Sequence, residues 1–195
     1  FETNSDVTKA RAYQQACKID RDEAKTLKSL GKDLDRVLLL NQSALKHAQA
    51  ALDHAEKTPD KFLKAEILFD IALLSSFSGD VENASKYLDL LSDLLKEYPF
   101  TLEQARSYEL RGDLEYLHGN KEQAYRLYFD ALKILSQYSP ASFYQNYRRF
   151  RSRLYAEDES TKQIVKDIAA AKLANPNDPL LIGVRNLCFG TYIGE

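Results

Sequence analysis

The three histidines are the side chains best suited to hold a metal ion or to exchange a proton near neutral pH. They are His47, His54 and His118. The first two lie seven residues apart, hence on nearly the same face of a helix but about two turns apart, whereas two metal ligands on one helix usually lie four apart. We therefore predict no metal site and expect all three histidines to be exposed on helices.

The segment 144–155 combines four arginines with aromatic residues and contains no acidic residue. Such interleaving is typical of surfaces that bind nucleic acid. On a helix, however, the segment separates into three faces. Arg149 and Arg153 lie on one face, and the others are a buried apolar stripe (Phe143, Tyr147, Phe150 and Leu154) and an aromatic and basic face (Tyr144, Arg148, Arg151 and Tyr155). The stripe explains part of the aromatic content, and we expect no nucleic-acid partner.

The sequence contains no glycine-rich phosphate loop and no nucleophile elbow. Acidic clusters such as Asp22-Glu23 and Glu157-Asp158-Glu159 fit helix starts, where the helix dipole favours negative charge. With 27 basic and 29 acidic residues, the net charge of −2 provides no global field for nucleic acid or anionic membrane. We therefore predict no enzyme and no cofactor. We also predict no membrane insertion, because no apolar run approaches about 20 residues.

Cys17 and Cys188 carry the information about cellular compartment. One falls in the first predicted helix and the other in the last. Helices stacked about 8–10 Å apart would separate them by more than the roughly 7 Å that a disulfide spans between Cα atoms. We therefore expect two free thiols, which fit a reducing compartment slightly better than the periplasm. The location stays open between the cytoplasm and a periplasmic ectodomain.

The elements that must position these side chains repeat every 40 residues. Gly79-Asp80 recurs as Gly119-Asn120, and each pair is followed four residues later by an alanine. Self-similarity at such a period indicates stacked helical units, none of which buries its apolar face alone. We expect helix contacts along three series: Ala44, Ala84, Ala124 and Ile164; Ala48, Leu88, Tyr128 and Ile168; Ala51, Leu91, Ala131 and Ala171.

Caps and breaks predict an all-α chain without strands. Thr58-Pro59 and Ser139-Pro140 pair a capping hydroxyl with a proline at the first helical position, and Gly79 and Gly119 suit left-handed helix ends. The predicted helices are 5–30, 34–57, 59–78, 81–98, 102–118, 121–138, 140–156, 160–174 and 179–189. They form one domain over 1–195, with an atypical capping hairpin at 1–58, hairpins at 59–98, 102–138 and 140–174, and a capping helix at 179–195.

Two central units resemble the tetratricopeptide repeat (TPR) family. The first has Ala65-Glu66-Ile67-Leu68-Phe69-Asp70-Ile71-Ala72, Gly79-Asp80, Ala84, Tyr87-Leu88 and Leu91; the second has Tyr108, Gly112, Tyr116, Gly119-Asn120, Ala124, Tyr128 and Ala131. The resemblance covers 65–138 well and 141–176 more weakly, with a period longer than the family's. It implies a right-handed array of helical hairpins, a TPR-like α-solenoid, whose concave face binds protein or peptide. It implies no catalytic residues.

In this family, the positions that match Phe69, Glu109 and Arg149, and Leu73, Asp113 and Arg153, line the concave groove. The resemblance therefore implies a groove that runs apolar, acidic and basic. In one interpretation, Glu109–Arg149 and Asp113–Arg153 are internal ion pairs. In the other, an extended ligand places an apolar side chain near the first unit and an acidic group near the two arginines. The predicted groove residues are Phe69, Leu73, Glu109, Asp113, Tyr116, Arg149 and Arg153.

These observations predict a non-catalytic scaffold or adaptor domain that binds a protein or peptide. The alternative is a ligand-sensing extracytoplasmic domain of a bacterial membrane signalling protein, because similar long-period repeats occur in sensor kinases and diguanylate cyclases. A start at Phe1, the lack of methionine and the apolar segment near 180–193 favour the sensor, with adjoining membrane or signalling segments. The free cysteines favour the adaptor.

Overall fold

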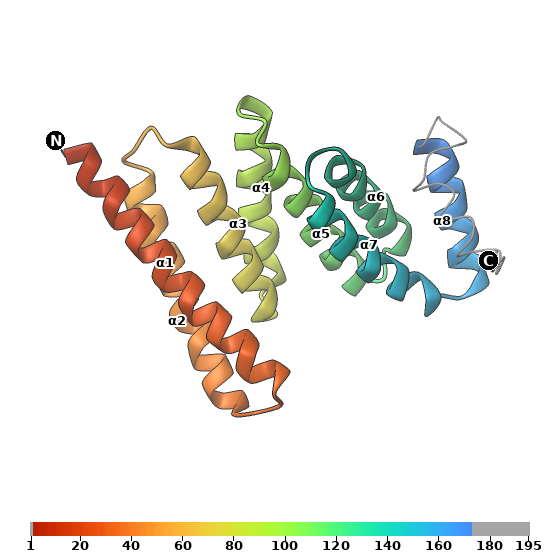
Figure 1. Cartoon of the computed structure of the whole chain (residues 1–195), viewed down its shortest axis with the longest axis horizontal. Coiled ribbons are helices and arrows are strands. Elements are labelled where there is room, and N and C mark those ends of the chain that lie inside the picture. The colour runs from red at the N-terminus through yellow and green to blue at the C-terminus, as the bar shows by residue number, and fades with distance from the viewer. Residues whose placement is uncertain (1, 173–195) are drawn as a thin grey trace. The chain divides into compact units, whose positions relative to one another are not determined.

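The computed structural model describes residues 2–172, and over this range the chain is all-α, with eight helices and no strand (Figure 1). Their arrangement is an array of helical hairpins, which confirms the predicted fold class. The right-handed sense of the array stays a prediction. The helices are α1 (Glu2–Ser29), α2 (Leu34–Ala55), α3 (Lys61–Phe77), α4 (Val81–Glu97), α5 (Thr101–Leu117), α6 (Lys121–Tyr138), α7 (Pro140–Tyr155) and α8 (Glu159–Lys172).

The chain divides into two compact units, which we call unit 1 (Phe1–Ser107) and unit 2 (Tyr108–Glu195). Unit 1 contains α1 to α4 and the first turns of α5, and unit 2 contains the rest of α5 and α6 to α8. The prediction of one continuous domain stays a prediction. The predicted capping helix at 179–195 lies outside the described residues.

Two helix-start predictions are wrong. α3 begins at Lys61 instead of Pro59, because Asp60 is its N-cap and accepts a hydrogen bond from the Leu63 N–H at 2.9 Å. The Thr58 hydroxyl instead donates to the Ala55 carbonyl oxygen at the end of α2. The Asp22-Glu23 pair lies inside α1 and marks no helix start.

Glycines end the helices where the sequence predicts left-handed caps. Gly79 has φ 75° and Gly119 has φ 82°, both in the region that a residue with a Cβ rarely adopts. The next N–H in each case, that of Asp80 or Asn120, donates back to a carbonyl five residues earlier at 2.9 Å. These turns reverse the chain between α3 and α4 and between α5 and α6.

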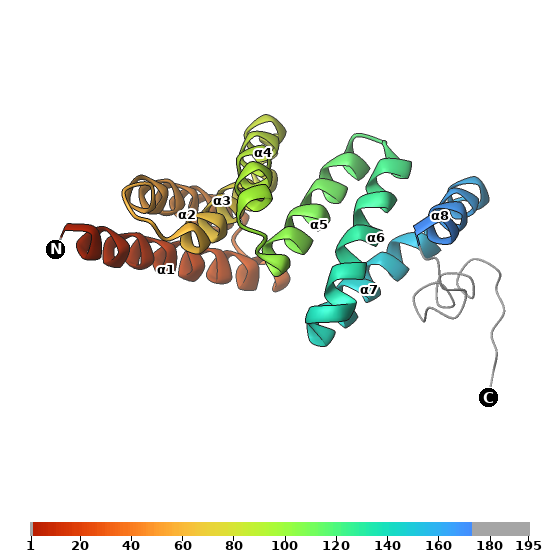
Figure 2. The ribbon, with the colours of Figure 1, turned by 90° about the horizontal axis from the view of Figure 1, so that it is seen from above.

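Helices α1 and α2 lie side by side along their length (Figure 2), and small residues line their contact. Ala10 and Cys17 of α1 are fully buried against a row of alanines on α2 that also covers α3. Short side chains bring two helix backbones together, so this hairpin forms one wall of unit 1. The alanines of the row are Ala44, Ala48, Ala51 and Ala55.

The histidine prediction is wrong for His47 and His54, which are half-buried in the seam between α1 and α2. The Nδ1 atom of His54 lies 2.7 Å from a carboxylate oxygen of Asp6, and that of His47 lies 3.1 Å from one of Asp20. The Tyr13 ring stacks on His54 with centroids 5.8 Å apart. The carboxylates come from α1, so the interhelical contact keeps both imidazoles from full exposure. His118 is exposed as predicted.

The 40-residue register holds through α6 and slips in α8. The first three members of each predicted contact series are buried, but Ile164 and Ala171 are exposed, whereas Val165 and Ile168 are buried. α4 and α6 start 40 residues apart at 81 and 121, yet α8 starts at 159. The early start has a local cause: Asp158 accepts a hydrogen bond from the Thr161 N–H at 2.7 Å and caps the helix.

Candidate functional site

The predicted groove residues fall into different units, and the two groups have different surroundings. Phe69 and Leu73 belong to unit 1 and line an open cavity. The other five belong to unit 2 and bind one another or neighbouring polar groups: Glu109, Asp113, Tyr116, Arg149 and Arg153.

The cavity in unit 1, which we call the α1–α3 groove, has a volume of about 510 Å³. This volume lies within the roughly 300–1,000 Å³ of most ligand sites. The helices α1, α2, α3 and α5 line the groove with five basic, three acidic and six other residues. They are Lys18, Arg21, Lys25, Lys28 and Arg106; Asp22, Glu66 and Asp70; and Ala24, Val37, Asn41, Phe69, Leu73 and Phe77.

An apolar row from α3 forms one side of the α1–α3 groove. Phe69, Leu73 and Phe77 recur every four residues, so they lie one above another on the same face of the helix. Phe77 is 57% exposed, and the guanidinium of Arg106 lies 5.9 Å from the centroid of the Phe69 ring. The row therefore presents apolar surface to solvent beside a cation.

A basic row from α1 forms the other side of the groove. Two of its members bind acidic residues of α3: Arg21 lies 2.5 Å from Asp70, and Lys18 lies 3.8 Å from Glu66. Lys25 and Lys28 are exposed and form no ion pair with any residue in 2–172. The groove thus contains two positive charges that the described chain leaves unpaired.

The Arg21–Asp70 pair anchors α1 to α3 at the base of the groove. Burial raises the pKa of the Asp70 carboxyl, although the adjacent Arg21 and Lys18 work in the opposite direction. The Asp70 side chain is only 6% exposed, so its charge is compensated within the protein and is not available to a ligand. This pair therefore has a positioning role in the groove wall.

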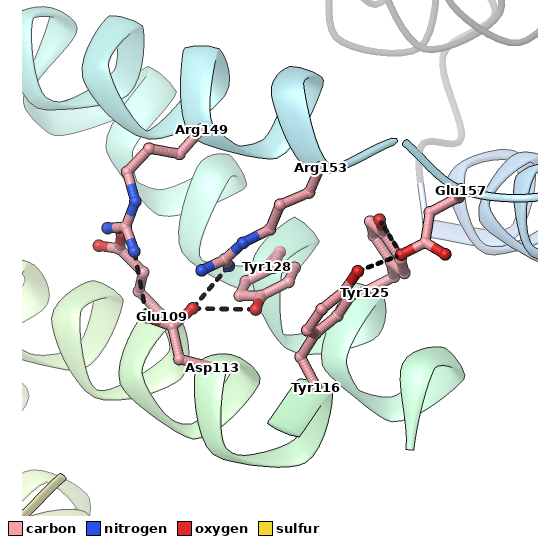
Figure 3. A network of polar contacts seen from close by, with 8 residues as sticks. All are labelled: Glu109, Asp113, Tyr116, Tyr125, Tyr128, Arg149, Arg153 and Glu157. Atoms are coloured by element: carbon pink, nitrogen blue, oxygen red, sulfur yellow. Dashed lines mark hydrogen bonds and ion pairs between the residues drawn. The ribbon is translucent and has the colours of Figure 1, made fainter. Parts of the chain in front are cut away.

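In unit 2 the predicted ion pairs are present (Figure 3). Arg149 binds Glu109 through one guanidinium nitrogen and lies 3.1 Å from Asp113 through another. Arg153 lies 2.6 Å from the second Asp113 oxygen, which also accepts a hydrogen bond from the Tyr128 hydroxyl at 2.9 Å. Both predicted pairs, Glu109–Arg149 and Asp113–Arg153, are thus present and span the 40-residue period.

Glu157 is the centre of a second set of contacts beside these pairs (Figure 3). Its carboxylate accepts hydrogen bonds from the hydroxyls of Tyr116 at 2.6 Å and Tyr125 at 3.2 Å, and it also binds the Lys121 ammonium. Burial alone would raise the pKa of Glu157, but the hydrogen bonds from Lys121 and Tyr116 lower it below its ordinary value. Tyr116, a predicted groove residue, is therefore held by an internal acceptor.

Little space remains around the unit 2 network. The Arg153 guanidinium lies 4.9 Å from the centroid of Tyr128 and 5.6 Å from that of Tyr116, so the two rings flank it. The cavity between Glu109, Arg149 and Phe150 measures about 10 Å³. This is at most the space of a single water molecule. This cavity is therefore too small for a peptide side chain.

The aromatic and basic face of α7 is exposed as the helical spacing predicts. Tyr144 is 67% exposed and Tyr155 is 52% exposed. Arg151 lies 5.5 Å from the centroid of the Tyr155 ring, and the apolar stripe is represented in the core by Phe150 and Leu154. These residues line neither of the two cavities described above.

Sequence reasoning missed Glu157 and the basic row of α1. The signal for α1 is a second spacing: Arg11–Asp60, Lys18–Glu66 and Arg21–Asp70 are ion pairs 49, 48 and 49 residues apart. The first hairpin is longer than the others. The basic residues of α1 therefore pair with acidic residues of α3 that lie 48 or 49 positions later, and not 40. Glu157 precedes a helix, and its partners come from two other helices, so no periodic pattern identifies it.

Within residues 2–172 no cluster of potential metal ligands occurs, and no helix there is long and apolar enough to cross a membrane. No protein-family model matches the chain, and a search of curated proteins found no match.

Proposed function

We propose that the chain is a non-catalytic, TPR-like domain that binds a protein or peptide segment in the α1–α3 groove. The observation that carries this proposal is the position of Phe69 and Leu73. The family resemblance implies that both belong to a ligand groove, and both line the same cavity of about 510 Å³. With Phe77 they form a partly exposed apolar row. Exposed apolar surface of this kind often marks a binding site.

The contrast with unit 2 supports placing the ligand in unit 1. The five predicted groove residues of unit 2 all have internal partners, so a ligand there would first have to displace ion pairs and hydrogen bonds. In the α1–α3 groove a ligand would replace only water over the apolar row. Binding in unit 1 therefore carries the smaller desolvation cost.

The composition of the groove supports binding without catalysis. None of the residues that line it in the described part of the chain is a histidine, cysteine, serine or threonine. Its buried carboxylate, Asp70, is held by Arg21. We propose recognition by apolar contact and charge, in either of the two predicted contexts, an adaptor or a bacterial sensor protein.

The proposal is tested by selecting binders from a displayed library of random peptides with the whole chain as bait. Selected peptides are then titrated against the wild type, Phe77→Ser and the control Leu39→Ser. Leu39 is 64% exposed on α2 and does not line the groove, so the control removes a similar apolar surface elsewhere. We expect Phe77→Ser to weaken binding by about tenfold, from the loss of one apolar anchor.

Circular dichroism and the urea midpoint of Phe77→Ser establish that the variant is folded. Peptides that bind the Phe77 and Leu39 variants with equal affinity would place the site outside the groove. A selection that enriches no peptide would count against peptide binding altogether.

A further inference from the structure

We infer that the α1–α3 groove recognises a short extended peptide segment in which apolar and acidic residues alternate. This inference rests on the proposed function and adds the chemistry of the partner. Two observations carry it: the apolar row of α3 faces a basic row of α1, and two lysines of that basic row have no acidic partner within residues 2–172.

The two rows run in the same direction along the groove. The ion pairs Arg11–Asp60, Lys18–Glu66 and Arg21–Asp70 follow one another in the same order on α1 and α3. Helix α1 therefore runs parallel to α3 through this contact. On α1, Lys25 and Lys28 follow Arg21. On α3, Leu73 and Phe77 follow Asp70 in the same direction. The unpaired lysines thus lie at the end of the groove where the apolar row is most exposed.

The length of the apolar row matches a short extended segment. From Phe69 to Phe77 the helix rises by about 12 Å at 1.5 Å per residue. Four residues of an extended chain span about 13 Å at roughly 3.3 Å each. A tetrapeptide therefore runs the length of the row, and the cavity of about 510 Å³ has the volume of a small ligand and not of a whole helix.

The alternation follows from the geometry of an extended chain. Successive side chains of a strand point to opposite sides. A segment that lies between the two rows therefore presents every second side chain to Phe69, Leu73 and Phe77 and the others to the lysines of α1. Burial of the first set against the apolar row stabilises the complex, and so does the attraction between acidic side chains of the second set and the lysines.

The charge of the partner follows from the pairing within the groove. Lys18 and Arg21 are bound to Glu66 and Asp70, and Arg106 lies 3.3 Å from Glu103. Lys25 and Lys28 remain, and they lie one helical turn apart. Asp22, the third acidic lining residue, lies 4.0 Å from Arg21. With five basic and three acidic lining residues the groove is positive, although the whole chain has a net charge of −2, and it selects carboxylates over ammonium groups.

The test uses three fluorescein-labelled peptides with the whole chain. The probe contains the repeated segment Leu-Glu-Leu-Glu, a charge control contains Leu-Lys-Leu-Lys, and an apolar control contains Ser-Glu-Ser-Glu. Fluorescence anisotropy reports the affinity of each at low and high salt. We expect the probe to bind at least about tenfold more tightly than either control, with an advantage over the Lys peptide that shrinks between about 50 and 500 mM salt.

Matched charge reversals then locate the contact. Lys25→Glu/Lys28→Glu changes the groove, and Lys46→Glu/Lys133→Glu makes the same change in net charge at exposed lysines that do not line it. We expect the first pair to weaken the Leu-Glu-Leu-Glu peptide by about tenfold at low salt and the second pair to change its affinity by less than about twofold. Both variants must keep the wild-type urea midpoint within error.

The outcomes separate this inference from the proposed function. If peptides selected from the random library depend on Phe77 but bind the Lys25→Glu/Lys28→Glu variant as tightly as the wild type, the groove binds peptides and the acidic specificity is wrong. Equal binding of the three labelled peptides would overturn the inference in the same way. If no peptide, selected or designed, depends on Phe77, both the specificity and the groove itself are rejected as a peptide site.

Discussion

Unit 1 and unit 2 contain the same predicted groove positions, but one unit leaves them open and the other fills them. In unit 1 the positions are Phe69 and Leu73, and the cavity beside them measures about 510 Å³. In unit 2 they are acidic on α5 and basic on α7, and the side chains meet across the gap. In this chain, apolar residues at these positions line a groove, and opposite charges at them form an internal contact.

The physical reason is the reach and charge of the side chains. A carboxylate and a guanidinium attract each other, and both extend far enough to close the space between neighbouring helices. A phenylalanine or leucine opposite a lysine has no such partner, and the lysine ammonium stays in water. The described part of the chain therefore leaves the apolar row of unit 1 uncovered.

The largest effect that we expect concerns Cys17, in the α1–α2 wall of the open groove. Burial raises the pKa of its thiol from 9.0 to about 12, which lowers the thiolate fraction by about a thousandfold. Native Cys17 should therefore resist alkylation at pH 8 and react rapidly in denaturant. Mass spectrometry of the Cys17 peptide after timed labelling measures both rates. Fast labelling of the native chain would mean that α1 does not pack as a wall of the groove.

Overpacking tests the contacts that both units share. Ala84 of unit 1 and Ala124 of unit 2 are fully buried, and leucine at either position should cost about 1–3 kcal/mol of unfolding free energy. Urea unfolding measures both variants, with Ala170→Leu as a control at an exposed position. If the midpoint shifted for only one of the two variants, the two alanines would not lie at equivalent close helix contacts.

Glu157→Gln weakens the filled region of unit 2 and leaves unit 1 untouched. The amide keeps the shape but loses the charge that binds Lys121 and the hydroxyls of Tyr116 and Tyr125, which should cost about 1–2 kcal/mol at pH 7. Urea unfolding of both proteins at pH 7 measures the difference. An equal free energy of unfolding would mean that the network adds nothing to stability.

The same pair of proteins gives a pH test. The pKa of Glu157 is lowered on folding from its ordinary value of 4.5, so its carboxylate stabilises the folded state above that value. This contribution is lost as the pH falls through the lower pKa of the folded protein. The gap between wild type and Glu157→Gln should therefore be full at neutral pH and close progressively below about pH 4.5. A gap that widens in acid would reverse the assigned sign.

The smallest effect concerns the predicted ion pair at 40-residue spacing. The Arg149 side chain is 51% exposed, so the Glu109–Arg149 interaction should contribute only about 0–1 kcal/mol. Arg149→Glu should lower stability slightly, and the added Glu109→Arg change should restore part of the loss, as a double-mutant cycle detects. A coupling energy of zero would show that the pair adds nothing to stability.

Much of the fold could be predicted from the sequence. The all-α class, the hairpin turns at Gly79 and Gly119 and the buried small residues of α2, α4 and α6 follow from local geometry, since a glycine with positive φ ends a helix and an alanine permits close approach. The start of α3 could not be predicted as reliably, because Thr58 and Asp60 compete to cap it and the outcome depends on which oxygen reaches the Leu63 N–H.

For the candidate sites, the sequence by itself determined which residues recur at equivalent positions and which of them have complementary charge. The pairs Glu109–Arg149 and Asp113–Arg153 could be predicted because a regular repeat places them on adjacent helices. Only the tertiary structure decided that the groove lies between α1 and α3 and that Glu157 joins Tyr116 to Tyr125. Those contacts depend on a longer first hairpin and on an early start of α8, two departures from the period that bring together side chains no repeat relates.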